Sequence, residues 1–180
     1  MKQQYRKSIF ALMLLTTMHL GLISAQAHVE GHMPDSVAEM EYRIFLEFKP
    51  NNVETRVKLA TVLMNQDKLA EAEKEFNRCL DKSPRNLQAN MGLSQLKLKQ
   101  HKTSEALNLI KKAKGIDQDN PAVYLHYGQI LEANDQTLEA KQMYKAGLEK
   151  ILKNPKNLEV QHDRKPLEDA LQKLEEKPVK

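Results

Sequence analysis

Most of the chain consists of segments in which apolar residues recur every three or four positions, the spacing of one face of an α-helix. In residues 69–82, Leu69, Ala72 and Phe76 fall on one face, and Pro84 ends the segment because the residue before a proline disfavours the helical region. Short polar stretches separate the segments. The pattern predicts an all-α fold, with helices over residues 53–64, 69–82, 87–99, 103–116, 121–133 and 137–152. Thr103 and Thr137 are candidate N-caps.

The helices fall into a repeat of 34 residues. Alanine recurs at this interval at Ala38, Ala72, Ala106 and Ala140. A column of large apolar residues keeps the same spacing: Tyr42, Phe76, Ile110 and Tyr144. A third column, called the small column here, has the same spacing and contains small residues in its last three members: Phe45, Cys79, Ala113 and Gly147. Residues 35–49 carry the first member of each column, and we expect them to form the second helix of an incomplete first unit.

These columns resemble the tetratricopeptide repeat (TPR), a 34-residue helix–turn–helix unit. The match is good in units 53–86 and 121–154 and weaker in unit 87–120, where Lys97 replaces a large apolar residue and Gln118 replaces a proline. The resemblance implies a helical solenoid over residues 35–154, in which each unit buries its apolar face only against its neighbours.

Such an array needs a cap at each end. Residues 35–49 would cap the N-terminal end, and residues 155–180 are expected to supply a C-terminal capping helix and tail. Pro166 suits a first helical position there, and the same segment has one apolar face, formed by Leu167, Ala170, Leu171 and Leu174. Docking of a partner on that helix is the alternative.

Residues 1–27 have the pattern of a secretory signal peptide. Basic residues precede an apolar stretch over residues 9–23, and Ala25-Gln26-Ala27 then forms a cleavage signature. We expect cleavage after Ala27, with cleavage after Ala25 as an alternative. An uncleaved anchor is less favoured, because the apolar stretch is shorter than the roughly 20 residues that span a bilayer. The sequence therefore predicts an exported protein, periplasmic or secreted, with a flexible N-terminus over residues 28–34 and no membrane span after cleavage.

The charge balance argues against a nucleic-acid partner. The whole chain has 28 basic and 24 acidic residues, and removing Lys2, Arg6 and Lys7 with the leader leaves 25 against 24. The mature chain is thus nearly neutral, without the basic footprint of a nucleic-acid-binding protein.

The single cysteine, Cys79, excludes an intrachain disulfide and belongs to the small column, which predicts a core position. No cysteine follows the apolar stretch, so the leader is not of the lipoprotein type.

No motif of the sequence indicates catalysis, and we expect neither an enzymatic activity nor a cofactor. Two histidines near the mature start, His28 and His32, form a possible transition-metal site. An N-terminal tail whose histidines bind nothing is the simpler interpretation.

In TPR arrays, the first helices of successive units line a concave groove that binds peptide segments. Carried onto this chain, the groove has an apolar row of Val57, Met91 and Leu125, and an uncharged polar row of Thr61, Gln95 and Gln129. The same face continues through Met64, Leu98 and Glu132, with Asn65 and Lys99 at its edge and His126 facing the groove. We expect Met91 and Leu125 to be partly exposed, unless the C-terminal helix folds back over Val57 or Leu125.

This chain lacks the basic and amide residues by which chaperone-adaptor TPR domains bind a C-terminal carboxylate. The matching positions hold Val57, Thr61, Gly92, Ala122 and His126.

The sequence thus predicts a non-enzymatic, exported interaction module that binds a peptide or protein segment of unknown identity. An initial helix that ends before Pro50-Asn51-Asn52 resembles periplasmic TPR factors of cytochrome c maturation, which implies an assembly or maturation role. A self-assembling scaffold, and a metal-handling protein that uses His28 and His32, are the alternatives. Formation of a homo-oligomer remains open.

Overall fold

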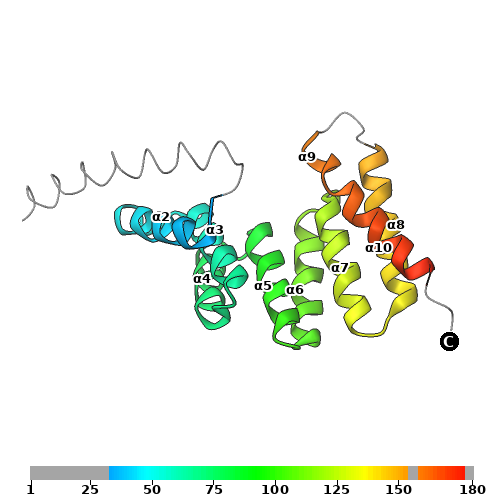
Figure 1. Ribbon diagram of the computed structural model, residues 1–180, viewed down its shortest axis with the longest axis horizontal. Coiled ribbons are helices and arrows are strands. Elements are labelled where there is room, and N and C mark those ends of the chain that lie inside the picture. The colour runs from blue at the N-terminus through cyan, green and yellow to red at the C-terminus, as the bar shows by residue number, and fades with distance from the viewer. Residues whose placement is uncertain (1–32, 154–157, 177–180) are drawn as a thin grey trace, which may run out of the picture.

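The computed structural model describes residues 33–153 and 158–176, and these residues are helical with no strand. The leader, His28 and His32 lie outside the described residues, so the predictions that concern them stay predictions. The helices stack along the long axis of the molecule, from α2 at one end to α10 at the other (Figure 1). Their bounds are α2 (Asp35–Phe48), α3 (Val53–Asn65), α4 (Leu69–Lys82), α5 (Leu87–Lys99), α6 (Thr103–Ile116), α7 (Pro121–Ala133), α8 (Thr137–Lys153), α9 (Leu158–Gln161) and α10 (Arg164–Glu175). The six helices of the three complete units match the predicted ranges to within a residue.

Each first helix of a complete unit begins at an asparagine. The side chains of Asn52 and Asn86 accept hydrogen bonds from the backbone N–H groups three residues later, both at 2.8 Å, and Asn120 caps α7 in a similar way. These asparagines are 34 residues apart and satisfy N–H groups that a helix leaves unpaired at its start. The prediction of Thr103 as an N-cap is wrong, because Lys102 holds that position and Thr103 is the first residue of α6. Thr137 is likewise the first residue of α8.

The turn inside each complete unit depends on one residue in the left-handed conformation. Asp67, His101 and Asp135 have φ of 61°, 59° and 58°. The N–H of the next residue then bonds back to the last turn of the first helix, as Lys102 does to Lys97 at 2.9 Å. Asp and His tolerate this conformation better than most non-glycine residues. The position of His101 is therefore explained by the turn.

Close packing between the helices explains two glycines on the first helices. A side chain at Gly128 would collide with the ring of Tyr144 in the same unit, and one at Gly92 would collide with the ring of Phe76 in the preceding unit. Cys79 is fully buried, as predicted, and burial raises the pKa of its thiol to about 11. The two glycines thus mark places where helices approach closely, and Cys79 has the core position that its column predicts.

Lys97 of the middle unit is buried even though it is charged. Its ammonium group lies 2.6 Å from Glu73 and 3.1 Å from Glu105, so it joins α4, α5 and α6. Glu73 also accepts a hydrogen bond from Gln100 at 3.0 Å. The departure of this unit from the TPR pattern is thus offset by an ion-pair cluster in place of apolar contact.

The array is capped at its C-terminal end by α10, which packs on α8. Leu167 is fully buried and lies against Gly147, and Leu174 is almost fully buried. The helix starts at Arg164, two residues before the position expected from Pro166, which is compatible with a proline in the first turn. None of the helices in the described part of the chain is both long and apolar enough to span a membrane.

Candidate functional site

The first helices form the inner side of the array. Helix α3 contacts α5, and α5 contacts α7, whereas the second helices α4, α6 and α8 contact mainly the first helices on either side of them. Closer spacing on one side of a stack makes that side concave. The predicted groove residues lie on these three first helices, but they differ widely in exposure.

The predicted residues fall into three classes. The exposed ones are Thr61, Asn65, Lys99 and Gln129. The half-buried ones are Val57, Gln95, Leu98, His126 and Glu132. The buried ones are Met64, Met91 and Leu125.

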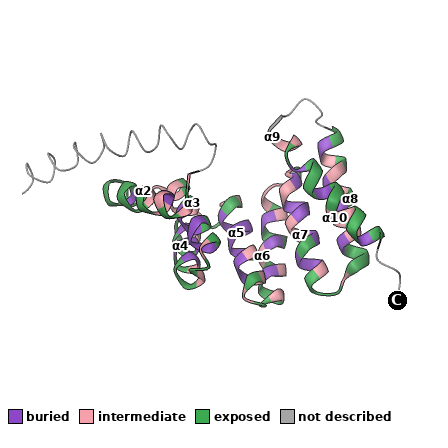
Figure 2. Cartoon of the chain, in the orientation of Figure 1, coloured by how far each residue is buried: buried purple, intermediate pink, exposed green. Residues whose placement is uncertain are grey.

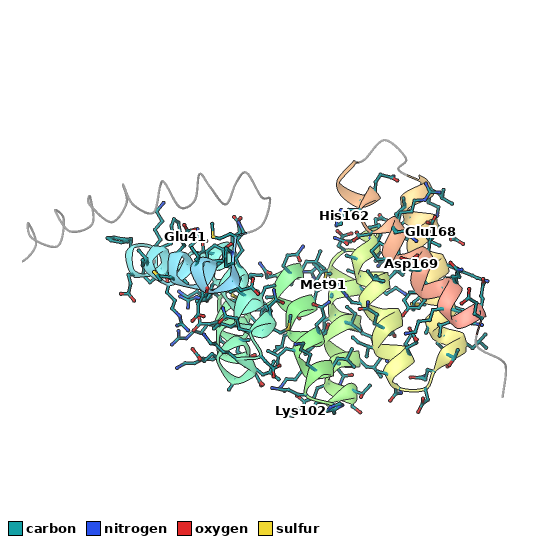
Figure 3. The ribbon with its side chains drawn as sticks, viewed as in Figure 1. Glu41, Met91, Lys102, His162, Glu168 and Asp169 are labelled. Carbon is teal, nitrogen blue, oxygen red and sulfur yellow. The ribbon has the colours of Figure 1, made fainter. Side chains whose placement is uncertain are left out.

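The expectation that Met91 and Leu125 are partly exposed is wrong. Met91 is only 5% exposed and packs in a cluster with Ile110 and Val123, because α5 meets α6 and α7 there. Figure 3 labels Met91 in the middle of the array. Leu125 is 7% exposed and shares a cluster with Leu167 of α10, as in the alternative in which the C-terminal helix covers it.

Met64 is also buried, in the core cluster that joins α3, α4 and α5. The predicted apolar row is therefore continuous with the core over most of its length. Of its three members, Val57 alone keeps a partly accessible side chain.

A cleft with a volume of about 710 Å³ opens beside Val57. Its walls come from α2, α3 and the start of α5, and most of its lining surface is apolar. The lining residues are Tyr42, Val53, Glu54, Val57, Lys58, Thr61, Val62, Asn86 and Gln88. The cleft thus includes two predicted residues, Val57 and Thr61, and places them at the N-terminal end of the concave face.

The charges at the cleft neutralise one another. Glu54 and Lys58 form an exposed ion pair at 2.8 Å, one turn apart on α3. This hydrogen bond lowers the pKa of Glu54 and raises that of Lys58. The hydroxyl of Thr61 donates to the carbonyl of Val57 at 3.0 Å, which leaves its oxygen available as an acceptor. An apolar side chain with an uncharged backbone fits these walls better than an ion does.

In the middle of the concave face, the polar side chains of Gln95, His126 and Gln129 lie side by side and do not line a cleft. The amide nitrogen of Gln95 lies 2.7 Å from Nδ1 of His126, which in turn lies 3.1 Å from Oε1 of Gln129. In the neutral ring, Nδ1 either accepts from Gln95 or donates to Gln129, so the tautomer decides which bond forms. Burial lowers the pKa of His126, which keeps the ring neutral near pH 7.

The segment before α10 approaches the same histidine. The buried carboxyl of Asp163 interacts electrostatically with His126, and it lies 3.2 Å from the ring of His162. Burial raises the pKa of Asp163, against the effect of the two histidines. Residues at the C-terminal end of the predicted groove therefore contact the chain's own cap.

Two more predicted residues have structural partners. Lys99 reaches the carbonyl of Met64 at 3.4 Å and Asp67 at 3.7 Å, and so links α5 to the end of α3. Glu132 accepts a hydrogen bond from the hydroxyl of Tyr144 at 2.8 Å. Both residues stabilise the array where they lie, whether or not a partner is bound.

The sequence pattern does not identify several of the lining residues. Tyr42 belongs to a packing column, and Asn86 and Gln88 lie outside the predicted groove residues. The spacing of Val53, Val57 and Thr61 at four-residue intervals on one helix face was the available signal. The position of Tyr42 beside them depends on how α2 packs on α3, which the sequence pattern does not give.

No group of three or more His, Cys, Asp or Glu residues in residues 33–153 and 158–176 is arranged to hold a metal ion. The thiol of Cys79 is fully buried and lies 3.8 Å from the carbonyl oxygen of Val53.

Comparisons with known proteins identify the architecture. No protein-family model matches the chain, and no curated protein matches it in sequence. Solved structures do match. The type III secretion translocator chaperone SycD of Yersinia enterocolitica is 16% identical with a TM-score of 0.61, covering 69% of this chain and 92% of that chain. The TPR domain of Sgt2 from Aspergillus fumigatus is 15% identical with a TM-score of 0.57, covering 72% of this chain and 87% of that chain.

A third match was solved with a peptide. The first TPR of Spaghetti (RPAP3), bound to the HSP90 peptide SRMEEVD, is 20% identical with a TM-score of 0.52, covering 67% of this chain and 93% of that chain. At these identities the likeness concerns the fold. Together with the 34-residue period of the sequence, it shows that this chain has the fold of the tetratricopeptide-repeat proteins.

Proposed function

We propose that this chain is a non-enzymatic adaptor that binds an extended segment of a partner protein on its concave face. An apolar side chain of the segment would enter the cleft beside Val57, and the peptide backbone would run toward the amides of Gln95 and Gln129. The main support for this proposal is the cleft itself, which is open, mostly apolar and lined by residues of α2, α3 and the start of α5.

The cleft suits a peptide for energetic reasons. Burying one aliphatic or aromatic side chain contributes about 1.5–3 kcal/mol, and amide side chains can pair with backbone groups that would otherwise be desolvated. Neighbouring structures support the same class of ligand. RPAP3 was solved with an HSP90 peptide, and SycD with a peptide of the translocator YopD. Their low identity to this chain leaves the partner's sequence undefined.

We further propose that the adaptor acts outside the cytoplasm, as an assembly or maturation factor for exported proteins. The support is the pattern of residues 1–27, which ends in Ala25-Gln26-Ala27. The intact mass of the protein recovered from the exported fraction tests this. Export with cleavage predicts a chain that begins at His28, and a mass that retains residues 1–27 contradicts it.

Photo-crosslinking in the producing cells tests the binding site. A photoreactive amino acid is placed at Thr61, which lines the cleft and is exposed, or at Lys74, which is exposed on α4 outside the cleft. We expect crosslinked partner bands from position 61 and none from position 74. Equal crosslinking from both positions, or crosslinking from position 74 alone, would place the binding surface elsewhere on the array.

A further inference from the structure

The outer face of α2 has a stripe of exposed apolar side chains. Met40, Ile44 and Phe48 follow one another at four-residue intervals and are 53%, 43% and 63% exposed, and Phe45 beside them is 39% exposed. In Figure 2 much of α2 is green, whereas α5 and α7 carry more purple. Apolar residues scattered singly are normal on a protein surface, but a contiguous row on one helix marks an interaction surface.

The repeat shows that Met40 and Ile44 of this stripe are specific to α2, whereas the position of Phe48 holds Lys82, Ile116 and Lys150 in the complete units. At the position of Met40, the complete units have the exposed polar residues Lys74, Asn108 and Gln142. At the position of Ile44, they have the exposed basic residues Arg78 and Lys112 and the small, half-buried Ala146. At these two positions, therefore, the complete units carry polar or small side chains, and only the unit at the N-terminal end carries large apolar ones.

The position of α2 as the second helix of an incomplete unit does not explain the stripe. In complete units the first helix packs on the small column, whose member in α2 is Phe45. Met40 and Ile44 instead lie on the face that complete units turn toward water. The opposite end of the array is covered by α10, so the two ends differ. Figure 3 shows this separation, with Glu41 at one end and Glu168 and Asp169 at the other.

The charges beside the stripe are arranged to pair with a second copy. Glu41, Arg43, Glu47 and Lys49 flank it. Glu41 and Glu47 form no ion pair with any residue of the described chain, whereas Arg43 pairs with Glu39 and Glu71 and keeps further N–H donors, and the ammonium group of Lys49 lies over the ring of Phe45. If two α2 helices cross antiparallel about Phe45, Glu41 of one copy lies near the partner's Lys49, and Arg43 near the partner's Glu47. Two-fold symmetry repeats each pair, which gives four complementary contacts around an apolar centre.

We propose that two copies of this chain associate through α2, with the Met40–Ile44–Phe48 stripes packed antiparallel. Tyr42, which lines the cleft, lies on the opposite side of α2 from Met40 and Ile44. The dimer therefore leaves both clefts open, and it presents two concave faces to a partner. The inference does not depend on the proposed peptide binding.

Light scattering coupled to gel filtration tests the dimer, with the protein purified in the form that the producing cells contain. The wild type is expected at about twice the mass of one chain. Ile44→Glu with Phe48→Glu is expected at the mass of one chain, with unchanged helical circular dichroism. Leu138→Glu with Leu152→Glu is the matched control, because these residues are similarly exposed (68% and 62%) on α8, and it should stay dimeric.

Charge reversal tests the antiparallel register. Glu41→Lys alone and Lys49→Glu alone each place like charges together, and each should raise the dissociation constant of the dimer about tenfold. The two changes combined should restore it to near the wild-type value. The proposal is overturned by a wild type that remains a single chain up to its solubility limit. A dimer that survives Ile44→Glu with Phe48→Glu, or a combined charge variant that stays as weak as the single ones, also overturns it.

Discussion

The side-chain amide of Gln95 on α5 lies 2.7 Å from Nδ1 of His126 on α7 and joins the second and third units across the concave face. This bond divides the inner surface into two parts. Toward the C-terminus, side chains bond to one another and interact electrostatically with Asp163 before α10, whereas toward the N-terminus the surface opens into the cleft beside Val57. A bound segment would therefore be anchored at the α2–α3 end.

The partial burial of His126 predicts a pH dependence of stability. Burial lowers its pKa in the folded chain, so the unfolded chain binds more protons as the pH falls through about 6.5. We expect the free energy of unfolding to rise between about pH 5.5 and 7.5 and then level off. Urea titrations of the wild type and of His126→Gln measure this, and the variant should show a smaller rise.

The control for His126 is His101→Asn. His101 is exposed in a turn with φ of 59°, a conformation that asparagine also adopts. This variant should keep the rise in stability between the two pH values. If His126→Gln keeps the full rise as well, another group causes it.

Alanine substitutions at two helical glycines distinguish the effect of close packing on stability from the effect of helix propensity. A side chain at Gly92 would meet the buried ring of Phe76, whereas one at Gly115 would meet nothing within 4 Å. We expect Gly92→Ala to lower the free energy of unfolding by about 1–3 kcal/mol through overpacking. Gly115→Ala should leave it unchanged or raise it by up to about 1 kcal/mol. Urea midpoints that change equally in the two variants would mean that α4 and α5 do not approach as described.

The ion-pair cluster of Lys97 is replaceable by apolar packing. The equivalent residues of the other complete units are Leu63 and Leu131, and Glu73 is open enough to water to remain charged without Lys97. Lys97→Leu should therefore leave the free energy of unfolding unchanged or higher. Lys97→Ala leaves a cavity in addition, and it should cost about 2 kcal/mol or more. A loss in Lys97→Leu as large as that in Lys97→Ala would contradict this view of the middle unit.

The burial of Met91 reverses an expectation from the sequence. Met91→Glu would place a charge in the cluster with Ile110 and Val123, without a partner, and should unfold the middle of the array. Val57→Glu puts the same charge at the partly accessible wall of the cleft and should leave helical circular dichroism near the wild type. Near-wild-type melting of Met91→Glu would show that its side chain faces water.

The sequence was sufficient for the helices and for their order. Their bounds follow from local signals, such as the proline at Pro84, and their order follows from columns, such as that of Ala72, which repeat every 34 residues. The local signals did not predict how deeply each residue of a column is buried. Val57, Met91 and Leu125 have the same position in their units, yet the first lines a cleft and the other two are buried. The difference comes from what the next element places against each residue.

The cleft and the stripe on α2 show the same limit. Tyr42 fits its packing column, but its role as a wall of the cleft depends on the angle at which α2 meets α3. The stripe of Met40, Ile44 and Phe48 is legible in the sequence once each position is compared with its equivalents in the complete units. The shared columns alone do not reveal it, because the complete units carry polar or small residues at the positions of Met40 and Ile44.

The central claim is that the cleft beside Val57 holds an apolar side chain of a bound peptide. Isothermal titration of the captured partner segment into the wild type, Val57→Glu and Lys74→Glu tests it most directly. Val57→Glu should weaken binding at least tenfold, which corresponds to about 1.4 kcal/mol, because a carboxylate in the wall must lose water when the apolar side chain enters. Lys74→Glu, on the second helix of the same unit, should bind like the wild type. Wild-type affinity in a folded Val57→Glu variant would contradict the claim.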